Sequence, residues 1–214
     1  MKAAMGVYAA ALHRAERGVD CALWLTTADG VPLKEMDPAA WYAELTDGDI
    51  TVVTRCGGPT IDIGCGPGRL TAAVSDLGVV ALGIDISPDA VRLAEARGAW
   101  ALERSVFDPL PGEGDWAHAL LIDGNLGIGG DPRGLLRRCA QLLRPSGTVL
   151  VEVEPPGTPT WHGNVAISDA WRTSEVFAWS IVGVDRIPEL AADAGLRVAD
   201  IWTEEGRWFS SLQN

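Results

Sequence analysis

Apolar and polar positions follow a regular succession of short strands and amphipathic helices from residue 60 to the end of the chain. Apolar runs predict strands at 60–64, 79–85, 99–105, 117–123, 148–154, 196–204 and 207–213. Helical spacing of apolar positions predicts helices at 69–77, 89–97, 132–143 and 188–194. Because strands that alternate with helices are typical of a parallel sheet with crossover connections, we expect an α/β fold.

The first part of the chain has a different pattern. Residues 2–17 are rich in alanine and predict a leading helix. The pair Asp29-Gly30, between two short apolar runs, predicts a hairpin over residues 21–35 that lies outside the main sheet. A helical and hairpin cap therefore precedes the predicted α/β core.

We divide the chain into an N-terminal cap, residues 1–57, and a core, residues 58–214. Short helices are expected from Pro38 and over residues 48–56 of the cap. Residues 155–186 begin with Pro-Pro-Gly and fit neither a helix nor a strand of the repeating α/β unit. We interpret this segment as an insertion after the fifth strand of the core.

Composition narrows the class of protein. A chain of 214 residues with 47% hydrophobic and 21% charged residues suits one α/β domain. It holds no run of about 20 apolar residues, and its N-terminus lacks a signal-peptide pattern, so we expect a soluble cytoplasmic protein without a membrane partner. The four cysteines are scattered singly, which predicts reduced thiols and no structural metal. A net charge of −12 disfavours nucleic acid as a partner.

The motif with the clearest chemistry is the segment IDIGCGPG at residues 61–68. An apolar strand runs into Gly64, Gly66 and Gly68, and a predicted helix follows. Glycine permits positive φ and lets the backbone approach a ligand, while the helix N-terminus supplies free amide donors. The spacing G-x-G-x-G differs from the G-x-G-x-x-G of dinucleotide-binding loops, so a nicotinamide-dependent oxidoreductase is disfavoured.

A second signal follows at the end of the next strand. The segment GIDIS at residues 83–87 places Asp85 21 positions after Gly64. In open α/β sheets, ligands lie beyond the carboxyl ends of the strands, where an acidic side chain can accept hydrogen bonds from both ribose hydroxyls of a nucleoside. The glycine loop and Asp85 together predict a nucleoside-containing ligand.

These motifs, in order, are D-I-G-C-G-P-G, G-I-D-I-S, S-V-F-D-P-L-P-G-E-G, L-L-I-D-G-N and L-L-R-P-S-G-T-V-L-V-E. The series resembles the successive motifs of class I S-adenosylmethionine-dependent methyltransferases, closely over residues 58–154 and loosely over residues 185–211. The resemblance implies a Rossmann-like methyltransferase fold: a doubly wound, seven-stranded, mostly parallel sheet in the order 3-2-1-4-5-7-6, with strand 7 antiparallel. It also implies S-adenosylmethionine as the cofactor.

The cofactor-binding residues that the resemblance implies are Asp62, Gly64, Cys65, Gly66, Gly68, Asp85, Ile86, Ser105, Val106, Phe107, Asp123 and Asn125. Asp62 would lie near the amino group of the cofactor, and Asp85 would accept hydrogen bonds from its ribose. Ile86 would pack on the adenine. Asp123 and Asn125 would face the sulfonium.

For the acceptor side, the sequence offers fewer candidates. Tyr8 in the leading helix, with Trp161 and His162 in the insertion, are the expected substrate-binding residues, and Asp123 and His162 are the candidate general bases. Five of the nine tryptophans follow the fifth predicted strand: Trp161, Trp171, Trp179, Trp202 and Trp208. Each of them suits core packing, and as a group they also suit a flat aromatic pocket or a cage for a cationic amine.

We therefore expect an enzyme that methylates an O, N or C atom of a small molecule, such as a secondary-metabolite intermediate. A protein or peptide methyltransferase is the second reading, for which a long acidic groove is expected. A module that binds the cofactor without turnover is the third, in which the acceptor site is filled. The acceptor and the oligomeric state are left open by the sequence.

Overall fold

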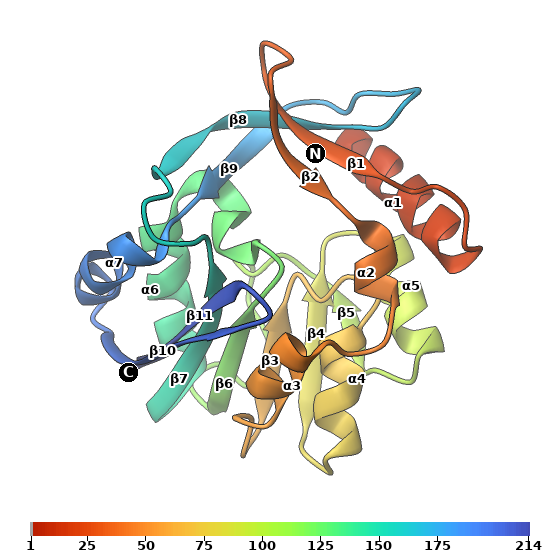
Figure 1. Cartoon of the computed structure of the whole chain (residues 1–214). Helices are drawn as coiled ribbons and strands as arrows, with labels where there is room; N and C mark the ends of the chain where they lie inside the picture. The colour runs from red at the N-terminus through yellow and green to blue at the C-terminus, as the bar shows by residue number, and fades with distance from the viewer. Residues whose placement is uncertain (1) are drawn as a thin grey trace.

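The computed structural model describes residues 2–214, with side chains from residue 5 onward (Figure 1). Met1, with which the expected cap begins, lies outside the described residues. Within residues 2–214 the strands form two sheets. The main sheet has the order β10-β11-β7-β6-β3-β4-β5, and the small sheet has the order β2-β1-β8-β9.

The strands of the main sheet are β3 (Thr60–Ile63), β4 (Ala81–Asp85), β5 (Ala101–Glu103), β6 (Trp116–Leu121), β7 (Leu143–Val153), β10 (Arg197–Glu204) and β11 (Arg207–Gln213). Neighbours from β5 to β7 pair in parallel, whereas β11 is antiparallel to both β7 and β10. When the seven strands are numbered 1 to 7 in chain order, the sheet reads 3-2-1-4-5-7-6 from the β5 edge. The expected doubly wound, seven-stranded, mostly parallel fold is therefore confirmed within the described residues.

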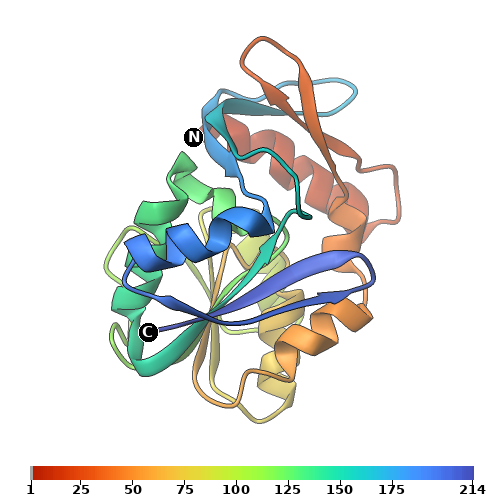
Figure 2. The same cartoon turned by 60° about the vertical axis from the view of Figure 1, so that its left-hand side comes forward.

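Helices cover both faces of the main sheet (Figure 2). On one face lie α3 (Asp47–Val53) and α4 (Arg69–Asp76), with α5 (Pro88–Ala96) beside α4; on the other lie α6 (Pro132–Leu142) and α7 (Ile187–Asp193). The 3₁₀ turns η1 (Asn125–Gly130) and η2 (Val184–Arg186) join these layers. Because both faces are covered, every position of β3 and β4 is buried, including the polar residues Thr60, Asp62 and Asp85.

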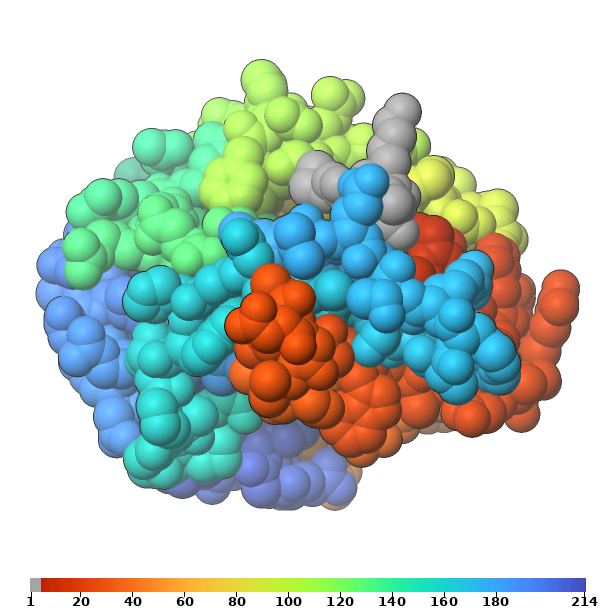
Figure 3. Space-filling model, turned by 90° about the horizontal axis from the view of Figure 1, so that it is seen from above, coloured from red at the N-terminus to blue at the C-terminus, as the bar shows by residue number. Residues whose placement is uncertain are grey.

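The small sheet lies over the carboxyl ends of the main-sheet strands (Figure 1). It joins β1 (Leu23–Thr27) and β2 (Pro32–Met36) of the N-terminal hairpin to β8 (Trp161–Ser168) and β9 (Phe177–Ile181). The helices α1 (Lys2–Glu16) and α2 (Pro38–Tyr42) complete the cap. From above, the hairpin and residues 155–186 form one continuous cover (Figure 3).

Residues 155–186, which match no helix or strand of the α/β core, contain β8 and β9, and both strands belong to the small sheet. The strand β8 pairs with β1, from Trp24 opposite Ser168 to Thr27 opposite Val165. A partner so distant in the sequence leaves no local signal, and the buried positions of β8 are confined to Val165, Ala166 and Ile167 near the end of the strand.

The last part of the expected cap packs with the core. Val52 and Val53 lie on α3, and Cys56 lies in the turn that follows it. All three are buried against Leu70 of α4 and Phe209 of β11. The helix α3 begins with a capping box in which Thr46 and Asp49 bond each other's backbone amides. Across the described residues, the helices are all too short or too polar to cross a membrane.

Candidate active site

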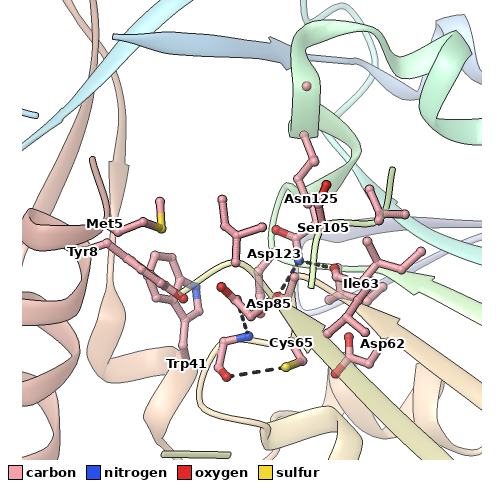
Figure 4. A pocket seen from close by; sticks show the side chains of 18 of the residues that line it. Met5, Tyr8, Trp41, Asp62, Ile63, Cys65, Asp85, Ser105, Asp123 and Asn125 are labelled. Carbon is pink, nitrogen blue, oxygen red and sulfur yellow. Dashed lines mark hydrogen bonds between the residues drawn. The ribbon is translucent and has the colours of Figure 1, made fainter. Parts of the chain in front are cut away.

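A cavity of about 410 Å³ lies between the main sheet and the cap. The carboxyl ends of β3, β4 and β6 form its floor. Its cover comes from α1, α2 and the small sheet, which contribute Met5, Tyr8, Leu25, Met36, Trp41, Ile167, Phe177, Ala178 and Trp179. Figure 4 shows Met5, Tyr8 and Trp41 approaching from the cap side and the polar residues of the core lying opposite them.

The glycine turn after β3 is shaped for close approach. Gly64 and Gly66 have φ of 73° and 52°, the left-handed region that favours glycine. A Cβ on Gly64 would lie 2.8 Å from Nδ2 of Asn125, and one on Gly66 would lie 3.2 Å from the Tyr8 hydroxyl. The absence of side chains at these positions therefore leaves a backbone-lined cradle at the cavity floor.

Asp85 holds this turn in place. Its carboxylate accepts hydrogen bonds from the backbone amides of Gly66, at 3.0 Å, and Ser87, at 2.8 Å. Burial raises the pKa of Asp85 to about 6, against the lowering effect of these amides. Each carboxylate oxygen can still accept from a further donor, such as a ribose hydroxyl.

Asp62 is the second buried carboxylate at the cavity. It accepts a hydrogen bond of 2.7 Å from the Thr71 hydroxyl, and burial raises its pKa to about 7. An unpaired buried acid of this kind favours a cationic neighbour, because a positive charge stabilises its ionised form. An ammonium group beside Asp62 would meet that requirement.

Asn125 and Asp123 follow β6. Asn125 donates from Nδ2 to the carbonyls of Ile63 and Gly64, at 2.9 and 3.0 Å, which leaves its Oδ1 able to accept a hydrogen bond. Asp123 has φ of 57°, and its backbone amide donates to Glu152 at 2.7 Å. The sharp turn after β6 is therefore fixed from both sides.

A charge network beneath this turn was not found from the sequence. Arg69 bonds Asp49 and, at 2.8 Å, Asp123, while Arg207 bonds Asp49 at 2.9 Å, Asp123 at 3.2 Å and Glu152 at 2.8 Å. Asp49 is fully buried. Among the described residues, Nε of Arg69 is the buried side-chain polar atom without a hydrogen-bond partner.

Both candidate bases have a defined environment. Asp123 lines the cavity, but both of its carboxylate oxygens accept from arginines, and burial still raises its pKa. His162 does not line the cavity. Its side chain is exposed, because it alternates along β8 with Trp161, Val165 and Ile167, which face α1.

Of the other two residues expected to bind the acceptor, one lines the cavity and one does not. Tyr8 lines the cavity over the glycine turn, and its ring lies 5.9 Å from that of Trp41 (Figure 4). Burial raises its pKa well above the usual value. Trp161 packs in the core of the cap and does not line the cavity.

The five late tryptophans do not gather into one pocket. Trp179 lines the cavity, whereas Trp171 is 69% exposed on the loop after β8. Trp202 stacks on Phe209 at 5.4 Å beside the main sheet, and Trp208 packs against the core of that sheet. The interpretation as an aromatic cage is wrong for this group, because these strands direct their side chains to different layers.

Most of the expected cofactor-binding residues line this one cavity: Asp62, Gly64, Cys65, Gly66, Asp85, Ile86, Ser105, Val106, Phe107, Asp123 and Asn125. Gly68 does not line it. Gly68 precedes α4 with φ of 79°, and a Cβ there would lie 2.7 Å from that of Ala94 on α5. Its role in the structure is helix packing.

Comparisons with known proteins agree with this geometry. Residues 61–147 match the family model of a methyltransferase domain. A ubiquinone biosynthesis O-methyltransferase of Xanthomonas campestris is 30% identical over 146 residues, which cover 63% of this chain and 52% of that protein. The chain thus spans about half the length of the curated relatives it matches.

Two solved structures share the fold. A SAM-dependent methyltransferase from Bacteroides fragilis, in complex with S-adenosyl-L-homocysteine, has a TM-score of 0.78 at 21% identity and covers 99% of this chain and 94% of its own. The 1,6-didemethyltoxoflavin-N1-methyltransferase of Burkholderia thailandensis has a TM-score of 0.60 at 19% identity. The match covers 82% of this chain and 80% of that protein. Residues 61–147 thus match a methyltransferase domain, and the strand order of the main sheet is that of the Rossmann-like methyltransferase fold.

Proposed function

We propose that this protein transfers a methyl group from S-adenosylmethionine to a small apolar molecule. One observation carries the proposal: the glycine turn and Asp85 line one side of a cavity, and apolar residues of the cap line the opposite side. The matched curated relative is named for methylation of an intermediate of ubiquinone biosynthesis, and the Burkholderia structure for methylation of 1,6-didemethyltoxoflavin, both small molecules.

The residues present fit this cofactor. The bare backbone at Gly64 and Gly66 would accommodate the methionine part, and Asp62 would hold its ammonium group. Asp85 would accept hydrogen bonds from the ribose hydroxyls. Ile86 and Val106 would enclose the adenine with apolar surface, as the resemblance implies.

When bound, S-adenosylmethionine supplies an electrophilic methyl group on a sulfonium. The task of the protein is to hold the acceptor atom in line and to exclude water. Asp123 is poorly suited to take a proton, because Arg69 and Arg207 already occupy its oxygens. We therefore assign Asp123 to positioning and expect an acceptor that needs no strong base, such as an amine or an ionised hydroxyl.

The acceptor side of the cavity is lined mainly by apolar groups, including Met5, Leu25, Met36, Phe177 and Trp179. Such walls favour a flat, uncharged molecule. A peptide substrate suits this cavity less well, because the α1, α2 and small-sheet residues of the cap line it opposite the glycine turn, and the hairpin and residues 155–186 lie over it when seen from above (Figure 3). The apolar cap residues that line the cavity opposite the glycine turn favour turnover over a module that only binds the cofactor.

We expect S-adenosylmethionine to bind with an affinity that rises from pH 5 to pH 7. The pKa of Asp62 is raised to about 7 and that of Asp85 to about 6, so both acids are protonated in part of the free protein at pH 5 to 7. The ammonium and ribose groups of the cofactor stabilise the ionised carboxylates, so each protonated acid loses its proton on binding. Binding then releases protons in this range, and the affinity should increase by about 10-fold or more. Calorimetric titration at several pH values measures both effects.

NADH serves as the control in the same titrations, since the turn lacks the dinucleotide spacing. No binding of NADH is expected at concentrations that saturate the site with S-adenosylmethionine. Asp62→Asn should flatten the pH dependence, because it removes the group with the higher pKa. Binding of NADH alone would refute the proposed function, and a pH-independent affinity for S-adenosylmethionine would refute the roles given to these two acids.

A further inference from the structure

A second, smaller cavity of about 40 Å³ adjoins the first. It lies among β2, the end of β7, β9 and η1. Four residues line both cavities: Leu25, Met36, Asp123 and Trp179. The side chains of Met36 and Trp179 therefore stand between the main cavity and a hollow beyond it, next to the turn that carries Asp123.

The small cavity has apolar walls and satisfied charges. Leu126, Val153 and Ile181 contribute apolar surface to it. Its acidic residues are already paired: Asp123 with Arg69 and Arg207, and Glu152 with Arg207. A ligand entering this space would therefore meet no uncompensated charge among the groups described here, which favours an apolar group over a charged one.

A partly exposed ion pair lies at the edge of the small cavity. Lys34 on β2 donates to Glu154 at the end of β7, and both residues line the cavity. Their side chains are 44% and 27% exposed, so the pair lies at the outer surface. It joins the cap to the core at this point.

We propose that the small cavity is an outer subsite of the acceptor site, which takes a short unbranched alkyl substituent of an aromatic acceptor. The ring would lie in the main cavity against Trp179, and the chain would pass Met36 and end at the Lys34–Glu154 pair. About 40 Å³ holds roughly three waters, so the subsite suits a chain of about three or four carbons. This inference rests on the proposed function, because it presumes that the acceptor binds in the main cavity.

The test uses 4-alkylphenols, from phenol itself to 4-hexylphenol, titrated by calorimetry into the protein saturated with S-adenosylhomocysteine. Each buried methylene should tighten binding about fourfold. The gain should continue to about the third or fourth carbon and then stop, because the chain reaches the ion pair. Binding is the readout, so the test does not depend on methyl transfer.

Two variants locate the effect. Met36→Trp should fill the space where the two cavities meet, which removes the gain with chain length; the gain is measured relative to phenol within the same variant. Lys34→Met should open the outer end, so that the gain continues through the longer chains. Arg186→Met is the control, since it removes another exposed ion pair, with Glu189, outside both cavities; it should behave as the wild type.

Unchanged affinity for S-adenosylhomocysteine and an unchanged melting temperature would show that both variants fold. An equal gain per carbon in Met36→Trp and the wild type would overturn the proposal. So would the absence of binding by every alkylphenol, or the same length limit in Lys34→Met. If S-adenosylhomocysteine itself fails to bind the wild type, the proposed function fails; if it binds and the series shows no length dependence, this inference alone fails.

Discussion

Replacing Asp85 with alanine should weaken the binding of S-adenosylmethionine by about 10-fold or more. The buried carboxylate would accept hydrogen bonds from the ribose, and hydrogen bonds to a charged group contribute about 1.5–3 kcal/mol each. It also accepts from the amides of Gly66 and Ser87, so its loss loosens the turn that would carry the methionine part. Calorimetry on the wild type and the variant measures the ratio of dissociation constants.

Glu95→Ala provides the matched control for Asp85→Ala. Glu95 is an exposed acid on α5, the helix that directly follows Asp85, and it does not line the cavity. Its replacement removes the same charge and should leave the affinity unchanged. An unchanged dissociation constant in Asp85→Ala would contradict the assignment of the ribose site to the end of β4.

The largest loss of stability is expected from Arg69→Met. This change takes away one of the two arginines that bond the fully buried Asp49, and it leaves Asp123 with Arg207 alone. Removing one member of a buried charge network costs about 3–5 kcal/mol. For a chain of this length, 3 kcal/mol lowers the melting temperature by about 6–12 °C. Thermal unfolding of the cofactor-free protein measures the loss.

A second substitution shows whether the loss comes from the unpaired acid. Arg69→Met combined with Asp49→Asn should recover part of the stability, because the neutral amide needs no counter-ion. Arg133→Met, which breaks an exposed ion pair with Asp193, should cost about 1 kcal/mol or less. A loss in Arg69→Met no greater than in Arg133→Met would show that the network does not stabilise the fold.

The core of the fold could be predicted because its signals are local. The apolar strand, the glycines and the helix after them lie within 61–77, and Asp85 ends the next strand. Parallel strands bring their carboxyl ends to one edge, so residues that follow separate strands meet in one cavity. The residues that the resemblance implies for the cofactor therefore line one cavity, except Gly68, where packing against Ala94 requires glycine; their contacts with the cofactor stay a prediction.

The cap could not be predicted in the same way, since it depends on pairing between distant segments. The insertion pairs its own strands β8 and β9 and joins the cap through β1, which lies some 140 residues from its partner β8. That pairing sets which residues of β8 face inward, and it turns His162 to the surface. Trp179 faces the cavity from β9, and Trp171 does not; their sequence environments alone do not distinguish them.

The charge network shows the same limit. Thr46 and Asp49 form a recognisable capping box, and Arg69 directly follows the glycine turn, but neither pattern indicates that the two charges meet. Arg207 reaches Asp49 from the last strand of the chain. Such contacts depend on the stacking of α3 on α4 and β10, which the sequence encodes only through scattered apolar positions.

The central claim is that the cavity under the cap is the S-adenosylmethionine site, and a crystal structure with S-adenosylhomocysteine tests it most directly. The ribose hydroxyls should lie within hydrogen-bond distance of Asp85, with the amino group beside Asp62 and the sulfur on the side of Asp123 and Asn125, facing the apolar residues of the cap. A nucleoside bound elsewhere, or a complex in which Asp85 contacts only Gly66 and Ser87, would contradict the account.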